Sequence, residues 1–458
     1  MHPFPGMMTR TSEIVAGLAV LLVLLAGCAG GRQTAAFERW QATEEREPER
    51  PAIAPADTVR TLDQVVATAL RKNRSVEAAR QDWRAALEEA PQAGALPDPV
   101  LSFGYFIEEV ETRVGPQKQR LGVKQSVPWF GTLGARKEAA LAGAEAARYQ
   151  YLQAAADLVR DAKRAYADLY ELSASIEVTR ANHALLRYWE RVLSTRYSTG
   201  EAGYSDLIQV QVELARLEDR LRSLEERRDP LVAALNALMD RPAAAPVGVP
   251  TVLPDEEPSP DATAVRKALR DRNPDLRAHR AMVEREEAGA DLAGKSGYPD
   301  FTVGVDWIRT DPRKIDGLAD DGKDPILAHV GVRLPLWRGR VSAAKEEAEA
   351  RREAAAARLE DRTRSLAAHL ETLLYRYEDA DRRIGLYRDA MIPKGEQALE
   401  AASSAYEAGE ADFLRVLDAE RTLLEFELSL ARARADRLRT RAGIDALLGG
   451  GAIKSRGE

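Results

Sequence analysis

The sequence is poor in the residues that most often carry chemistry. It holds one cysteine and five histidines in 458 positions. The histidines are dispersed, and there is no HExxH pattern, no Cys/His cluster and no glycine-rich phosphate loop. A lone cysteine also excludes an intramolecular disulfide. The sequence therefore predicts no catalytic residue, no metal site and no cofactor, and it disfavours an enzyme. The histidines are His2, His183, His279, His329 and His369.

A basic surface is also missing. The formal net charge is -7, and no arginine and lysine cluster is interleaved with aromatic residues, which make up only 6% of the chain. Proteins that track phosphates need such clusters, so nucleic acid is not an expected partner. Charged residues nevertheless reach 30%. Long tracts of Ala, Arg, Glu and Leu against that background are typical of extended helices and coiled coils rather than compact domains.

Long apolar runs are confined to the N-terminus. The run at 14–25 is too short to span a membrane as a helix but fits the core of a signal peptide. It ends in Leu-Ala-Gly-Cys at 25–28, which resembles the bacterial lipobox, where cleavage precedes the cysteine and the thiol is acylated. We expect 1–27 to be a lipoprotein signal peptide and Cys28 the lipidation site. Ala29 in place of Asp resembles lipoproteins sent to the outer membrane. The alternative is a buried N-terminal helix with an incidental cysteine.

Most of the remaining chain has the pattern of helix. Residues 28–60 are polar and rich in Glu and Pro, which predicts an extended N-terminal tether. An amphipathic helix is expected over 62–90. A second helix can run unbroken from Gly131 to Tyr197, roughly 100 Å at 1.5 Å per residue. After a turn, an apolar seam with a period of 3.5 residues predicts a helix that packs as a left-handed coiled coil and ends near Leu238. The seam residues are Leu207, Val210, Leu214, Leu217, Leu221 and Leu224.

The pattern changes between Pro97 and Gly131. Apolar residues occupy every second position, first from Leu101 to Ile107 and then, after a break at 111–117, from Leu121 to Trp129. A period of two is the side-chain period of a β-strand. Each run is about ten residues long, roughly what a tilted strand needs to cross a bilayer. Two strands are therefore expected within an otherwise helical chain.

This order of elements occurs twice. Strand-like alternation returns at 301–307 and 326–334, separated by an Asp- and Gly-rich loop. The turn at Tyr197, Gly200, Glu201 and Ala202 recurs with a constant offset at Tyr406, Gly409, Glu410 and Ala411. The seam after it recurs at the same offset, as Val416, Ala419, Leu423, Phe426, Leu430 and Ala433. We predict a first repeat at 61–240, a Pro-rich linker at 241–260, a second repeat at 261–449 and a tail at 450–458.

Four strands cannot form a closed membrane sheet alone. A sheet edge in hydrocarbon leaves backbone groups unpaired, and about eight strands are the fewest that close a barrel. The chain must therefore oligomerise. Two chains would give a minimal barrel, and three would leave room for a lumen. The alternative is a soluble β-sandwich insert with a buried apolar face. The residues expected to line a lumen are Arg120, Lys124, Asp306 and Arg333, with Ser102, Gly104, Thr302 and His329.

Taken together, these motifs resemble the TolC-like outer-membrane efflux family, over roughly residues 60 to 448. The resemblance rests on the duplication, on Pro97-Asp98-Pro99 and Pro299 before the first strands, on Pro-Trp-Phe-Gly at 128–131, and on the Tyr-x-x-Gly turns. It implies a mainly α fold in which a homotrimer forms a twelve-stranded outer-membrane β-barrel, continued by an α-helical coiled-coil periplasmic tunnel. The implied partners are a periplasmic adaptor protein and an inner-membrane transporter. The turns that would contact the adaptor carry Tyr197, Gly200, Gly203, Tyr406, Gly409 and Glu410.

The same resemblance implies a gate at the periplasmic end. Family members close the tunnel with acidic side chains just after the second turn. Asp418 occupies one such position, but Arg415 occupies the other. An Arg-Asp lock within a chain or between neighbouring chains is therefore expected. The alternative is a solvated helix pair without a function.

The resemblance implies an outer-membrane exit duct for drugs, metal ions or other small molecules. The Pro-Trp-Phe-Gly-Thr-Leu stretch at 128–133 looks like the subgroup paired with heavy-metal pumps. The competing hypothesis is a periplasmic coiled-coil scaffold lipoprotein without a pore. Such a scaffold would be a soluble trimer once its lipid is removed.

Overall fold

The computed structural model describes residues 31–45, 61–251, 253, 259–314 and 319–450. Its first half contains α2 (Gly31–Glu45), α3 (Leu62–Lys72), α4 (Arg74–Gly94), β1 (Val100–Thr112), β2 (Gly115–Val127), α5 (Thr132–Ser198), α6 (Tyr204–Glu226) and α7 (Arg228–Leu238). Its second half contains α8 (Ala262–Arg272), α9 (Pro274–Lys295), β3 (Asp300–Thr310), β4 (Ile326–Arg333), α10 (Arg338–Leu386), the π-helical turn η1 (Tyr387–Met391), α11 (Ile392–Glu407) and α12 (Phe413–Leu447).

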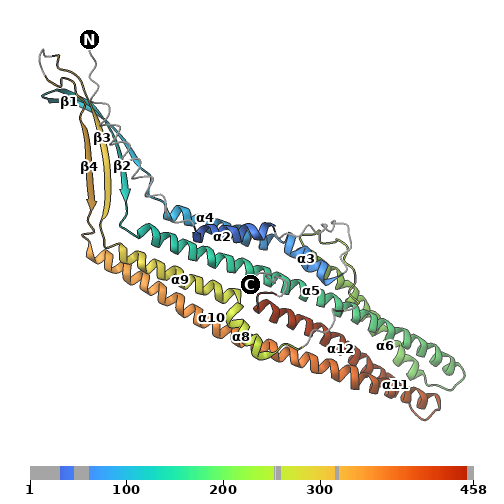
Figure 1. Ribbon diagram of the computed structural model, residues 1–458. Coiled ribbons are helices and arrows are strands. Elements are labelled where there is room, and N and C mark those ends of the chain that lie inside the picture. The colour runs from blue at the N-terminus through green and yellow to red at the C-terminus, as the bar shows by residue number, and fades with distance from the viewer. Residues whose placement is uncertain (1–30, 46–60, 252, 254–258, 315–318, 451–458) are drawn as a thin grey trace.

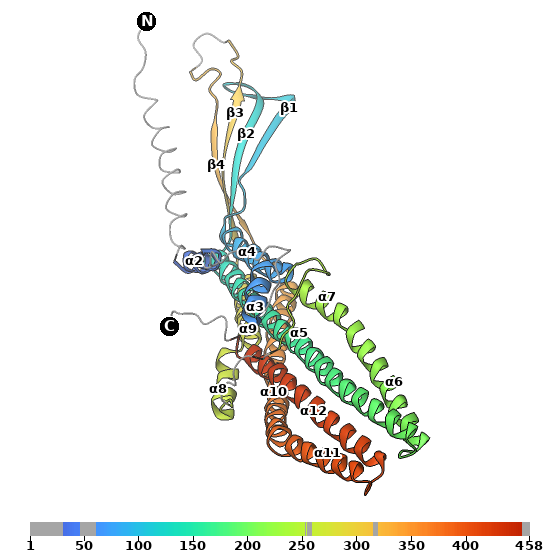
Figure 2. The ribbon, with the colours of Figure 1, turned by 90° about the vertical axis from the view of Figure 1, so that its right-hand side faces the viewer.

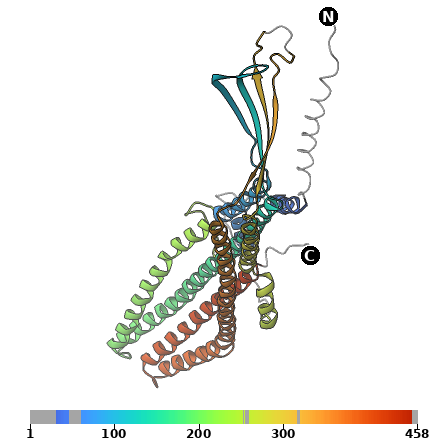
Figure 3. The ribbon, with the colours of Figure 1, turned by 90° about the vertical axis from the view of Figure 1, so that its left-hand side faces the viewer.

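The molecule is elongated, with a sheet at one end and two helical hairpins at the other. In Figure 1 the strands stand above the helices, and α5 runs from the sheet toward the far end. Figures 2 and 3 show the α5–α6 and α11–α12 hairpins extending in the same direction, which places their turns together at one extremity. The mainly α fold with a small sheet, expected from the sequence, is confirmed.

The four strands form one antiparallel sheet in the order β1-β2-β3-β4. Its hairpin ends point away from the helices (Figure 1). The first hairpin differs from expectation, because β1 and β2 continue to a two-residue turn between Thr112 and Gly115 where the sequence predicted a break at 111–117. Gly115 has a φ of +129°, a conformation open to glycine but strained for other residues. The second loop, between Thr310 and Ile326, agrees with the prediction.

The two repeats share an asparagine that links an early helix of the repeat to its last helix. Asn73 caps α4 and Asn273 caps α9 with their side-chain oxygens. Each amide nitrogen also donates to the end of the last helix of its own repeat, at Leu238 O (3.0 Å) and Leu447 O (2.9 Å). The single helix predicted over 62–90 is therefore wrong, since Asn73 divides it into α3 and α4.

The helices α5 and α10 can be long because neither contains an internal proline. The first, α5, spans 67 residues, about 100 Å at 1.5 Å per residue, as predicted. The second long helix is interrupted by η1, just before Pro393 at the start of α11. Proline lacks an N–H and clashes with the preceding turn, which accounts for the interruption. Among the described residues, no helix has the length and apolar character needed to cross a membrane.

The N-terminal tether prediction is wrong over Gly31–Glu45, which is helical. Trp40 of α2 is buried with Ala36 against α4 and α5, in one apolar cluster with Trp83 and Leu87. Its indole also lies 5.0 Å from the Arg84 guanidinium. This packing supplies the stability that the local composition does not. The predicted signal peptide, Cys28, and residues 451–458 of the predicted tail at 450–458 lie outside the described residues.

The linker at 241–260 packs against the first repeat in its described part. Val247 is buried in the same core as Leu62 and Leu235. The Asn236 amide donates to the carbonyls of Ala243 and Ala245 at 3.0 and 2.9 Å. These contacts fix the start of the linker to the helices that precede it.

Candidate functional site

The predicted lumen residues share one face of the sheet. Arg120 lies opposite Gly104, Lys124 opposite Gly304, and Asp306 opposite Gly122 in the strand register. Directly opposed residues of antiparallel strands project to the same side. This polar face also carries Ser102, Ser126, Asp300, Thr302, His329, Gly331 and Arg333, with Val100, Ile308 and Leu327 as its apolar members.

Asp306 is the centre of this polar face. It is fully buried and forms an ion pair with Arg120, and its Oδ2 lies 3.4 Å from His329 Nδ1. Arg333 pairs instead with Asp300 at 3.8 Å. The cluster needs a glycine at 122, because a Cβ there would lie 2.0 Å from the Asp306 carboxylate. The structure therefore brings Arg120 and Asp306 together and leaves Arg333 in a separate pair.

The opposite face of the sheet is apolar and has no covering element among the described residues. Phe103 is 67% exposed, Val123 49% and Val330 72%. An uncovered apolar surface of this kind marks a protein or membrane contact. The large exposed side chains on this face are Leu101, Phe103, Tyr105, Leu121, Val123, Val303, Trp307, Ile326, Val330 and Val332.

Aromatic side chains gather where the strands meet the helices. Trp129 stacks on Tyr298 with ring centroids 5.0 Å apart, and it contacts Phe301 at 6.0 Å. The Trp129 backbone N–H donates to Asp300 Oδ1 at 3.1 Å. Trp337 takes the equivalent place in the second repeat and is 77% exposed. Trp and Tyr side chains favour such positions at membrane–water interfaces.

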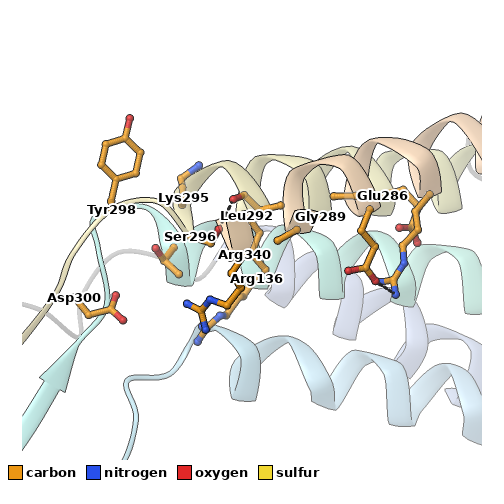
Figure 4. A pocket seen from close by; sticks show the side chains of 15 residues that line it. Arg136, Glu286, Gly289, Leu292, Lys295, Ser296, Tyr298, Asp300 and Arg340 are labelled. Carbon is orange, nitrogen blue, oxygen red and sulfur yellow. Dashed lines mark hydrogen bonds and ion pairs between the residues drawn. The ribbon is translucent and has the colours of Figure 1, made fainter. Parts of the chain in front are cut away.

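A polar cavity of about 430 Å³ lies next to these aromatic side chains, where α5, α9 and α10 meet the start of β3 (Figure 4). Arg136, Arg340 and Lys295 line it together with Glu286 and Asp300. Both arginines are exposed. Within the described ranges, no group of three His, Cys, Asp or Glu side chains could hold a metal ion. The lining of the cavity carries charges of both signs.

The two turns at the far end have matching backbones. Gly200 and Gly409 both have left-handed φ values, +80° and +76°. Non-glycine residues rarely adopt this conformation, which explains glycine at both places. Gly203 provides the N-cap of α6, and Glu410 is exposed. The α5–α6 and α11–α12 turns lie at one extremity of the molecule (Figure 2), and their role in docking stays a prediction.

The tyrosines of the two turns differ although their sequence positions correspond. Tyr197 is 46% exposed and contacts Tyr204. Tyr406 is buried and packs its ring against Phe413 at 5.3 Å and Trp189 at 5.9 Å. Tyr406 therefore belongs to the core of the tip, and its predicted place on a contact surface is wrong.

The predicted gate residues lie exposed near the start of α12. In the part of the chain that the structure describes, no ion pair joins Arg415 to Asp418. Asp418 pairs instead with Arg421 at 3.7 Å, and Arg421 also pairs with Glu213 of α6. An Arg415–Asp418 lock within the chain is therefore not formed, which leaves pairing between neighbouring chains.

The apolar seam predicted for α12 does not include Glu420, whose carboxyl group is buried. The buried side chains of its first half are Phe413, Val416, Leu417, Glu420 and Leu424, whereas Ala419 and Leu423 are only partly buried. A spacing of three and four residues connects Leu417, Glu420 and Leu424. Reading that spacing without regard to charge would have placed Glu420 in the core.

A sheet with one polar and one exposed apolar face, carried on long paired helices, defines a class of protein: outer-membrane transport channels that continue into a helical tunnel. The family model described as "Outer membrane efflux protein" matches residues 65–240 and 265–450. The chain therefore belongs to the outer membrane efflux protein family, and the TolC-like resemblance is confirmed.

Individual relatives are distant but matched over most of their length. The chain is 23% identical to the pyoverdine export outer membrane protein OpmQ of Pseudomonas putida, over 85% of this chain and 86% of that protein. It is 24% identical to the cobalt-zinc-cadmium resistance protein CzcC of Cupriavidus metallidurans, over 85% of this chain and 90% of that protein. The crystal structure of the outer membrane protein VceC from Vibrio cholerae superimposes with a TM-score of 0.69 at 23% identity, covering 85% and 96% of the two chains.

Proposed function

We propose that this chain is the outer-membrane exit duct of a tripartite efflux system. It would pass small molecules or metal ions from a periplasmic adaptor and an inner-membrane transporter to the outside. The observation that carries the proposal is the sheet. Within the described part of the chain it has an apolar face without cover, a polar face with buried charge, and open edges at β1 and β4. Membership of a family of efflux channels supports the same conclusion.

The open edges support a trimer. Unpaired backbone groups at β1 and β4 cannot remain in lipid, so β4 of one chain pairs with β1 of the next. Three chains with four strands each close a twelve-stranded barrel, large enough for a lumen lined by the polar face. The apolar face then contacts lipid. The aromatic side chains Trp129 and Trp337, where the strands meet the helices, lie at the periplasmic boundary of the membrane.

The helices form the periplasmic part of the duct in this proposal. Coiled together in the trimer, α5, α6, α10, α11 and α12 continue the barrel as a tunnel. The exposed tip residues Tyr197, Gly200, Gly203, Gly409 and Glu410 are the surface offered to the adaptor. Cys28, acylated after removal of 1–27, adds a lipid anchor to the same membrane.

Arg415 and Asp418 provide the proposed closure of the periplasmic end through pairs between neighbouring chains. Both side chains are exposed in a single chain and so are available to a neighbour. Replacing both with alanine should raise single-channel conductance. An unchanged conductance would exclude this gate, and Glu410→Ala at the exposed turn is the matched control that should leave it unaltered.

Cargo selection is assigned to the transporter rather than to the duct. Two relatives of this chain are named for different cargo, OpmQ for pyoverdine export and CzcC for resistance to cobalt, zinc and cadmium. The polar face carries charges of both signs, in the pairs of Arg120 with Asp306 and of Arg333 with Asp300. A wall with charges of both signs favours the passage of many hydrated molecules over the tight binding of a single kind of molecule.

Purification of the full-length protein in detergent tests the proposal. A duct gives a particle of three chains whose migration on a denaturing gel changes on heating. A soluble trimer that needs no detergent would favour the periplasmic scaffold instead. A monomer with no heat-modifiable form would contradict both.

A further inference from the structure

The helical tip contains a carboxyl group that the proposed gate does not use. Glu420 of α12 is 2% exposed and lies between Leu417 and Leu424, two members of the apolar cluster that joins α5, α6 and α12. Its Oε1 atom has no hydrogen-bond partner. A buried carboxylate without a partner is strongly unfavourable, so this position requires either a proton or a movement that admits water.

A second carboxylate stands near it on the neighbouring helix. Glu213 of α6 is 8% exposed, but Arg216 at 3.3 Å and Arg421 compensate its charge. Burial first, and then repulsion from Glu213, raise the pKa of Glu420 to about 8, while Arg421 acts in the opposite direction. The charged groups that shift this pKa, Glu213 and Arg421, lie on α6 and on α12 itself, while α5, α10, η1 and α11 also pack on α12.

We propose that the buried Glu420 carboxyl, close to Glu213, carries a proton at neutral pH, and that loss of this proton separates α6 from α12 at the periplasmic tip. The tip is the closed end of the duct in the proposed function, so the inference rests on that function. It adds that pH regulates the opening of this end. The ligand is a proton, and the site is the buried carboxyl of Glu420.

Arg421 couples this carboxyl to the tip. Its guanidinium is shared by Glu213 on α6 and Asp418 on α12. When Glu420 loses its proton, a third carboxylate competes for the same cation. Arg421 then turns toward its own helix, and the ion pair that joins α6 to α12 is lost. Water enters to hydrate the new charge, and the two helices move apart.

The direction of the pH effect follows from the two protonation states. Glu420 has an ordinary pKa near 4.5 when the chain is unfolded and a pKa of about 8 when it is folded. Between these values the folded protein holds a proton that the unfolded chain has lost. Stability therefore falls as pH rises from about 5 to 8 and is unaffected by this group above that range.

Planar-bilayer recordings of the full-length trimer test the inference. Channel opening of the wild type should rise with pH, with a midpoint near 8. Glu420→Gln, which imitates the protonated state, should stay at its low-pH level up to pH 9, and Glu420→Met should do the same if Gln disturbs folding. Glu425→Gln, a substitution at an exposed position of the same helix, should keep the wild-type profile. A rise in Glu420→Gln equal to that of the wild type would overturn the proposal.

Hydrogen exchange of the same trimer in detergent separates this inference from the function on which it rests. Corrected for the intrinsic pH dependence, exchange around Glu213 and Glu420 should increase above pH 8 in the wild type but not in Glu420→Gln. If the wild type carries no current at any pH, the proposed function fails, and hydrogen exchange alone decides on the proton site. Equal exchange in both proteins would overturn the proton site even if the channel conducts.

Discussion

Val123→Arg should prevent assembly of the barrel. Val123 lies on the apolar face of β2, opposite Leu101 and Val305, and is 49% exposed in the single chain. The 13 residues of β2, at about 3.3 Å each and tilted by about 40°, rise roughly 33 Å. Four residues from the periplasmic end of the strand, Val123 then lies about 10 Å into an apolar band about 25 Å tall. Its side chain is therefore close to the middle of the bilayer.

The expected cost follows from that depth. An arginine on the lipid face near the midplane destabilises a barrel by about 2–4 kcal/mol, and three chains bring the total to about 6–12 kcal/mol. This is comparable with the whole stability of many folded proteins, about 5–15 kcal/mol. We expect the heat-modifiable trimer to be lost from outer-membrane fractions, and any that forms to unfold at a lower urea concentration.

The neighbouring residue provides the control. Lys124 points to the polar face, so Lys124→Ala should assemble as the wild type does. Val123→Ile, which keeps the apolar character, should also assemble. If Val123→Arg formed as much heat-modifiable trimer as the wild type, the apolar face would not contact lipid, and the reasoning would be refuted.

Three further predictions concern the helical part. Asn273→Ala removes both the cap of α9 and the bond to Leu447 O, and should lower the free energy of unfolding by about 2–3 kcal/mol in thermal denaturation; a loss below about 0.5 kcal/mol would contradict this closing role. Trp40→Ala should release α2, seen as loss of hydrogen-exchange protection in that helix alone; retained protection would show that Trp40 does not hold it. Tyr406→Ala should destabilise the tip by about 3 kcal/mol, whereas Tyr197→Ala should change stability little, and equal effects would contradict their different burial.

Periodicity and proline placement predicted most of the fold. The alternation from Leu101 to Trp129, and its return at 301–334, located all four strands of the described sheet. The absence of proline after Gly131 predicted the long α5. Both signals are local, because a strand or helix face repeats at a fixed period. The polar face of the sheet followed from the same alternation.

The remaining features depend on contacts between distant segments. Composition averaged over 28–60 concealed α2, which is held by contacts with Trp83 and Leu87. Tyr197 and Tyr406 occupy matching positions in the sequence, but only Tyr406 has Trp189 and Phe413 beside it. Tertiary contacts of this kind leave no periodic signal.

In the gate region, the positions and partners of charged side chains also depend on contacts between distant segments. A carboxylate on a helix is normally assigned to the surface, so Glu420 was not expected in the core. Asp418 was expected to pair with Arg415, three residues before it, but Arg421 lies three residues after it and also reaches Glu213. Helical spacing allows either partner, and only the position of the neighbouring helix α6 decides between them.

Conductance combined with thiol modification tests the central claim, that the polar face of the sheet lines an aqueous pore through the outer membrane. Thr302 and Val303 are adjacent on β3 and project to opposite faces. In planar bilayers, a bulky water-soluble thiol reagent should reduce the current through Thr302→Cys trimers and leave Val303→Cys trimers unaffected. Absence of any channel, or block of Val303→Cys with Thr302→Cys unaffected, would contradict the account.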